Sequence, residues 1–98
     1  MEKVNKVLWT DKSEEALLNI YNFYAEKSEV AALHLIEKII DTGDSITLTK
    51  QYQVDDINPN YRRMIVGHHK ILYKEINNTV WIMNVIDSRQ DPAILENL

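Results

Sequence analysis

Cysteine is absent from this chain of 98 residues, and glycine and proline occur only twice each. Without cysteine there is no disulfide framework and no thiolate chemistry, which favours a reducing compartment. The apolar runs span only a few residues, and residues 1–6 lack the apolar core of a signal peptide. We therefore expect a cytoplasmic protein that does not enter a membrane.

An excess of basic residues is missing too, because the net charge is -4. Residues 1–49 hold five lysines and nine acidic residues, whereas residues 50–98 hold six basic and six acidic residues. All three arginines, Arg62, Arg63 and Arg89, lie in the second half. Since proteins that live on nucleic acid usually carry a basic footprint, this balance argues against docking into ribosomal RNA.

The first half of the chain carries two helical patterns. Asp11 and Glu14 resemble a capping box, and the apolar spacing that follows predicts a helix at about Ser13 to Glu26. Ser28-Glu29 looks like a second cap, and the next apolar stripe ends at residues 41–44, where Gly43 suits a left-handed C-terminal position. The short link between the two helices predicts an antiparallel helical hairpin.

The pattern changes to strands after the turn at residues 57–60. Three β-prone runs cover residues 61–66, 70–76 and 79–87, and short turns at Gly67-His68 and Asn77-Asn78 make them an antiparallel meander. Residues 6–10 form another short β-prone run at the start. Residues 80–86 are apolar on both faces, which predicts a central strand covered on both sides. The prediction is a single α+β domain over residues 1–98, with the hairpin on one face of a mainly antiparallel sheet.

Three tracts resemble the RelE/ParE toxin superfamily: Asn60-Tyr61-Arg62-Arg63-Met64-Ile65-Val66, His69-Lys70-Ile71-Leu72-Tyr73, and the stretch from Val80 to Pro92 that contains Arg89 and Asp91-Pro92. They match the superfamily's arginine pair entering a strand, its "I-x-Y" strand, and its last strand with an arginine followed by "D-P". The resemblance covers nearly the whole chain. It implies the toxin of a type II toxin-antitoxin module, neutralised by a small antitoxin that wraps the sheet and the helices.

The target depends on the branch of the superfamily. RelE-like members cleave messenger RNA in the ribosome, ParE-like members poison DNA gyrase, and some members have no shown activity. RelE-like nucleases resemble one another in a basic cluster and a Tyr, His or Glu near the C-terminus, whereas residues 90–98 here hold no Tyr or His. We therefore favour the ParE-like branch with gyrase as target. The alternatives are a ribosome-dependent endoribonuclease and an inactive homologue kept as an interaction protein.

The candidate site residues follow from this comparison. Arginine can hold phosphate or carboxylate with two parallel hydrogen bonds, which suits contact with a target or an antitoxin. The expected contact residues are Arg62, Arg63, Arg89, Lys50 and Trp81. If the chain is a nuclease, the catalytic candidates are Arg62, Arg63, Arg89, Tyr61 and Tyr73. The bland alternative for the arginines is pairing with neighbouring acids such as Asp55, Asp56, Asp87 or Asp91.

No cofactor or metal is expected, because adjacent histidines such as His68 and His69 rarely converge on one ion; we expect a turn-exposed pair. The helix pair carries more apolar side chains than its core-facing stripe can use. This surplus predicts a groove for an antitoxin helix or strand, formed by Leu18, Phe23, Val30 and Leu33. A homodimer or a heterotetramer with the antitoxin stays open.

Overall fold

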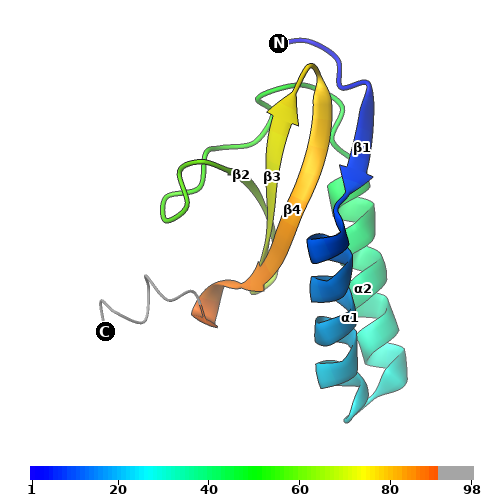
Figure 1. Cartoon of the computed structure of the whole chain (residues 1–98). Helices are drawn as coiled ribbons and strands as arrows, with labels where there is room; N and C mark the ends of the chain where they lie inside the picture. Colours follow the sequence, from blue (N-terminus) through cyan, green and yellow to red (C-terminus); the bar gives the residue numbers. More distant parts are fainter. Residues whose placement is uncertain (91–98) are drawn as a thin grey trace.

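The fold places a helical hairpin against a four-stranded sheet (Figure 1). A computed structural model describes residues 1–90. The elements in chain order are β1 (Lys6–Trp9), α1 (Asp11–Ala25), α2 (Glu29–Asp44), β2 (Arg62–Val66), β3 (His69–Ile76), β4 (Thr79–Asp87) and the 3₁₀ turn η1 (Ser88–Gln90). The predicted α+β class is confirmed. The apolar residues 93–95 also predict a last turn, which lies outside the described residues.

Both helices begin at side-chain caps. The Thr10 hydroxyl accepts a hydrogen bond from the Ser13 amide at 3.2 Å, so α1 starts two residues earlier than predicted and Asp11 lies inside it. Ser28 caps α2 as predicted and accepts from the Ala31 amide at 3.1 Å. Gly43 was expected to end α2 in a left-handed conformation, but it lies within the helix, where a Cβ atom would come within 2.5 Å of the Trp9 ring. Its lack of a side chain therefore serves a close approach between α2 and β1.

The strand order is β1-β4-β3-β2, with β1 parallel to β4 and the other pairs antiparallel. Asn77 and Asn78 take positive φ angles of 51° and 63°, the conformation that a tight two-residue hairpin turn requires. Gly67, at φ 57°, opens the turn between β2 and β3. The predicted meander is confirmed, and β1 joins it as a parallel edge strand because the helical hairpin forms the crossover.

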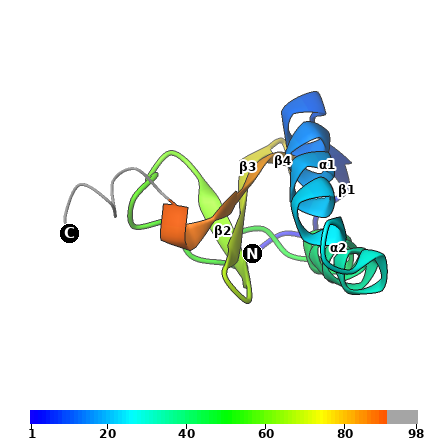
Figure 2. The same cartoon turned by 90° about the horizontal axis from the view of Figure 1, so that it is seen from below.

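The core lies between the hairpin and one face of the sheet, as the view from below shows (Figure 2). Strand alternation sends Val80, Ile82 and the half-buried Trp9 toward the helices. The buried members of this core are Leu17, Ile39, Ile46, Met64, Val66, Ile71, Tyr73, Val80, Ile82 and Val85. Trp81 and Ile86 point to the opposite face and are half-buried. Among residues 1–90, helices cover β4 on one side only.

The segment between α2 and β2, for which the sequence predicted only the turn at residues 57–60, runs along the outer edge of β2. The Arg63 amide donates to the Gln53 carbonyl at 3.0 Å, and the Asp55 amide donates to the Tyr61 carbonyl at 2.9 Å. Asp55 turns inward and pairs with Lys70 at 3.0 Å, although both residues are buried. Burial alone would raise the pKa of Asp55, but hydrogen bonds from Lys70 and Asn58 outweigh it and hold this pKa below its ordinary value.

Candidate functional site

Arg62 and Arg63 start β2 and point to opposite faces of the sheet, as their adjacent positions on a strand require. The guanidinium of Arg62 lies 3.1 Å from the Glu75 carboxylate and donates to the Tyr52 carbonyl at 2.7 Å. Arg63 donates to the Val54 carbonyl at 2.9 Å. Both arginines therefore hold the segment that follows α2 against the edge of β2.

Arg63 also faces two carboxylates, as the bland interpretation of the arginine pair predicts. Its Nη1 lies 3.8 Å from an Asp55 oxygen and 3.7 Å from an Asp56 oxygen. Asp55 is buried, whereas the Asp56 side chain is 88% exposed. The Asp55 contact belongs to the buried network, and the Asp56 contact is a surface pair of small energetic value.

Arg89 lies in η1, directly after β4, and is the most exposed of the three arginines. Its Nη2 and Nε atoms donate to the two carboxylate oxygens of Asp87 at 2.7 and 3.0 Å, a bidentate pair. This pair lowers the pKa of Asp87 to about 2 and raises the pKa of Arg89. The predicted pairing with Asp87 is present, and Asp91 lies outside the described residues.

The three arginines do not meet in one site. Arg62 is the cross-strand partner of Tyr73, whereas Val66, at the other end of β2, pairs with His69. At roughly 3.3 Å per residue, the two ends of β2 are about 13 Å apart. Arg89 belongs to the His69 end, because Asp87 is the β4 partner of His69. A nuclease centre built around both Arg62 and Arg89 would need these side chains in one concave patch, and they are not.

Four of the candidate residues do share a hollow at the point where β2 begins, which we call the edge hollow. It has a volume of about 500 Å³ and is bordered by Lys50, Tyr61, Arg62, Tyr73 and Lys74, together with Glu75. The Lys74 ammonium lies 5.1 Å from the centre of the Tyr61 ring. Three cations against one carboxylate make this the most basic concave surface that the candidate residues form.

Tyr73 is poorly suited to proton transfer in the edge hollow. Its side chain is fully buried, and its hydroxyl forms no hydrogen bond with any described residue. Burial and the nearby Glu75 charge raise the pKa of Tyr73 to about 12, so the phenol stays protonated at neutral pH. Tyr61, which is half-buried, is the more accessible phenol of the two.

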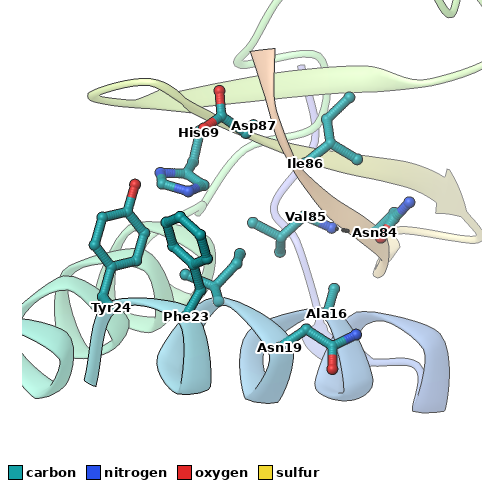
Figure 3. A pocket seen from close by; sticks show the side chains of 10 residues that line it. Ala16, Asn19, Phe23, Tyr24, His69, Asn84, Val85, Ile86 and Asp87 are labelled. Atoms are coloured by element: carbon teal, nitrogen blue, oxygen red, sulfur yellow. Dashed lines mark hydrogen bonds between the residues drawn. The ribbon is translucent and has the colours of Figure 1, made fainter. Parts of the chain in front are cut away.

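A second hollow opens between α1 and the end of β4 (Figure 3). Its volume is about 480 Å³, and Tyr24, His69 and Asp87 form its polar end. The Tyr24 and His69 rings meet edge to face with centroids 6.1 Å apart. The rest of the wall is mainly apolar and includes the exposed Phe23, and Asn19 and Asn84 add two amide side chains. Tyr24 was not among the site residues that the sequence predicted.

The prediction of a turn-exposed histidine pair is wrong for one of the two residues. His68 is exposed in the turn, but His69 is the first residue of β3 and only 4% exposed. Burial lowers the pKa of His69, although Asp87 opposes the shift. Strand alternation through Ile71 and Tyr73 was the available signal, because it places His69 on the core face. Among residues 1–90, no three His, Asp or Glu side chains lie close enough to hold a metal ion.

The four surplus apolar residues of the hairpin are all exposed, but they do not form one groove. Leu18 and Leu33 border a groove between the two helices, whereas Phe23 borders the hollow beside β4. Val30 is 64% exposed and borders neither of these. The predicted single surface is therefore divided in two.

No helix within the described part of the chain has the length and apolarity needed to cross a membrane.

A sequence model of the family described as "ParE toxin of type II toxin-antitoxin system, parDE" matches residues 7–92. The chain belongs to the ParE toxin family. A solved structure titled "Chromosomal ParDE TA system from P. aeruginosa" is 14% identical, with a TM-score of 0.71 over 86% of this chain and 96% of that one. This likeness shows the fold. No curated protein sequence matches the chain.

In this ParE-family toxin, the sheet face without helices combines apolar and basic side chains. The segment after α2 covers part of this face, because Asp55 pairs there with Lys70, which is buried. Ile65 is 56% exposed, and Trp81 and Ile86 are half-buried. Lys74 is the cross-strand partner of Trp81 on the same face. The expected contact residues are thus spread out: Lys50 and Arg62 border the edge hollow, Trp81 lies on the open face, and Arg89 lies beyond the end of β4.

Proposed function

We propose that this chain is a growth-inhibiting toxin of the cytoplasm that acts by binding DNA gyrase and is neutralised by a cognate antitoxin. The single observation that carries the proposal is the match to the ParE toxin family over residues 7–92. The arrangement of the arginines supports inhibition by binding rather than catalysis. Arg62 lies at the start of β2, whereas Arg89 follows β4 at the opposite end of these strands.

The contact with the target is assigned to Arg89, with Arg62 and Arg63 in a supporting role. Arg89 is 57% exposed and makes its ion pair with a single residue, Asp87, so it can exchange that partner for a carboxylate or phosphate of another molecule. Arg62 and Arg63 are fixed by several intramolecular contacts and shape the surface. The antitoxin is assigned to the part of the helix-free sheet face around Ile65, Trp81 and Ile86, since exposed apolar surface on a small protein marks an interaction site.

The second candidate is a ribosome-dependent endoribonuclease, and the basic edge hollow is the observation in its favour. In-line attack on RNA needs cations for the phosphate and groups that move protons, and Lys50, Arg62 and Lys74 with Tyr61 offer these types. Two features oppose it: Glu75 and the Tyr52 carbonyl already engage Arg62, and the Tyr73 hydroxyl is buried.

Induced expression of the chain without any partner tests the proposal. Stalled growth with SOS induction, together with stabilised DNA cleavage by purified gyrase, is expected. Message cleavage at fixed codon positions with intact DNA would instead establish the ribonuclease, and a thriving culture would mean an inactive homologue. Arg89→Ala should relieve the growth defect, whereas Lys12→Ala, at an exposed lysine of α1, should leave the defect unchanged.

A further inference from the structure

The hollow between α1 and the end of β4, which we call the α1–β4 hollow, has the size of a small-molecule site. Its volume is about 480 Å³, and sites for small molecules usually measure roughly 300–1,000 Å³. Ala16 and Ile20 of α1 and Val85 of β4 supply apolar side chains to its wall. The short side chain of Ala16 leaves space opposite Val85 that a longer side chain would fill (Figure 3). One or two fused rings match these dimensions.

His69 places a buried polar group at one end of the α1–β4 hollow. The residue is 4% exposed, and its ring is directed toward the rings of Tyr24 and Phe23 (Figure 3). Among residues 1–90, neither of its ring nitrogens forms a hydrogen bond. Burial lowers the pKa of His69, so at pH 7 the imidazole is neutral, with one nitrogen that accepts a hydrogen bond and one that donates. Since buried polar groups are ordinarily hydrogen-bonded, this imidazole is a ready partner for a ligand.

Aromatic rings border the hollow beside His69. Phe23 is 68% exposed and meets the Tyr24 ring edge to face, with centroids 5.2 Å apart. Tyr24 meets the His69 ring in the same way at 6.1 Å. Aromatic side chains attract a further ring through offset or edge-to-face contacts. The exposed Phe23 therefore offers a planar ligand a contact surface close to the imidazole.

The charges beside the hollow favour a neutral ligand. Within the described part of the chain, Asp87 is the one ionised residue that borders it. The bidentate pair with Arg89 already compensates the Asp87 carboxylate. An anionic ligand would face that carboxylate, and a cationic ligand would have to displace Arg89 from a charge-assisted pair. A neutral molecule meets neither obstacle.

We propose that the α1–β4 hollow binds a small neutral aromatic molecule that carries one N–H or O–H donor, of the indole or phenol type. The ring lies against Phe23 and Val85, and its donor reaches the accepting nitrogen of His69. The donor sets the specificity, because an apolar ring alone would leave the buried imidazole without a partner. This site goes beyond the proposed function and does not depend on it.

Three matched probes test the site on the full chain. Indene has the size and shape of indole but a CH₂ group in place of the N–H group, and indole-3-acetate adds a carboxylate. Titration followed by NMR should give indole a dissociation constant of about 1 mM or lower, with the largest shifts at residues that border the hollow. Indene should bind about threefold more weakly or worse, because it cannot donate to His69. Indole-3-acetate should also bind more weakly than indole.

The same titrations can overturn the proposal. Indole that does not saturate the chain, or that shifts residues away from the hollow, would exclude the site. Equal affinities of indole and indene would show that the imidazole is not the partner of the donor. Tighter binding of indole-3-acetate than of indole would contradict the neutral class of ligand.

A pair of alanine variants locates the bound molecule. Ala16→Leu fills the hollow and should weaken the binding of indole and of indene by about tenfold or more. Ala31→Leu makes the same change at an exposed position of α2, outside the hollow, and should alter both affinities by less than about twofold. Equal losses in the two variants would refute the location.

Two further variants test the partners of the ligand. His69→Leu should lower the affinity for indole to that for indene and leave the affinity for indene unchanged, because only the donor uses the imidazole. A His69→Leu chain that still prefers indole would refute this role. Since His69 is buried and its replacement can impair folding, Phe23→Ala, at an exposed residue, gives an independent test. It should weaken both ligands by about threefold or more, and unchanged affinities would refute the ring contact.

Discussion

Removing the Asp55 carboxylate should be among the most destabilising single changes outside the apolar core. Asp55 is 1% exposed and its Oδ1 lies 3.0 Å from the Lys70 ammonium, which is itself buried. Its Oδ2 accepts hydrogen bonds from the Asn58 amide at 2.8 Å and the Ile57 amide at 3.2 Å. Asp55→Ala therefore breaks this buried ion pair and releases the turn that ties the segment after α2 to β2.

The expected cost of Asp55→Ala is about 3–5 kcal/mol, because it breaks a buried ion pair and removes the acceptor of the Ile57 and Asn58 amides. A domain of this size has roughly 5–15 kcal/mol of stability in total, so the loss is a large fraction. At about 4–8 °C for each kcal/mol, the melting temperature should fall by at least about 12 °C. Lys70→Met should cost less, because Arg63 lies 3.8 Å from Asp55 and supplies part of the missing charge.

The neighbouring residue gives a matched control. The Asp56 side chain is 88% exposed, and its only ion pair in the described structure is a 3.7 Å contact with Arg63. Asp56→Ala should change stability by no more than about 0.5 kcal/mol. Urea unfolding followed by tryptophan fluorescence and circular dichroism measures both variants. Comparable midpoints for the Asp55 and Asp56 variants would refute the view that the buried pair anchors this segment.

The same pair should give the stability a defined dependence on pH. The pKa of Asp55 is lower in the folded chain than its ordinary value of 3.8, so its stabilising contribution is fully present above about pH 4. This stabilising contribution is lost as the pH falls through the pKa that Asp55 has in the folded chain. The stability difference between the wild-type chain and Asp55→Asn should therefore be constant near neutral pH and shrink in acid. A difference that grows in acid would contradict the assigned direction.

Three further changes test other parts of the structure. Tyr73→Phe removes a buried hydroxyl that has no hydrogen-bond partner among residues 1–90, so stability in urea should stay equal or rise by up to about 1 kcal/mol, and a marked loss would be inconsistent with this packing. Gly43→Ala should destabilise by about 1–3 kcal/mol, despite its better helix propensity, because the new methyl group meets the Trp9 ring; Trp9→Leu in the same chain should remove that cost. The pKa of His69 in the folded chain is lowered from 6.5. As the pH drops below about 7, the unfolded chain therefore protonates this histidine before the folded chain does, and the stability falls. His69→Gln should reduce the resulting fall in melting temperature, whereas the control His34→Gln, at an exposed histidine of α2, should not.

The sequence pattern was sufficient for the elements whose stability comes from local periodicity. The apolar spacing in α1 and α2 predicted both helices, and the alternation with short turns predicted the β2–β3–β4 meander. The family resemblance named the superfamily that the sequence comparison then showed. In each case the signal lies in neighbouring residues, which share one face of a helix or strand.

Contacts between distant residues could not be predicted in the same way. Lys70 looks like a solvent-facing strand residue until Asp55, fifteen positions earlier, folds in beside it. The sequence placed Arg62 among several candidate acids, but its partner, Glu75, was not one of them. Such pairs depend on strand register and on the path of an irregular segment. Neither of these produces a periodic pattern in the sequence. The candidate site was therefore predicted as residue types rather than as an arrangement.

Two exposed apolar surfaces lie on opposite faces of the sheet, which limits the shape of a partner that can reach both. Trp81 lies on the face without helices, and the groove bordered by Leu18 and Leu33 belongs to the helices that cover the other face. Edge strand β1 lies between them, with Leu8 directed to the Trp81 face and Trp9 directed to the groove. A globular partner touches only one side, whereas a chain with a helix and an extended segment can cross the short edge of β1 and occupy both. Contacts joined in this way reinforce each other through effective concentration, so an antitoxin fragment that keeps only one of them should bind far more weakly than the intact chain.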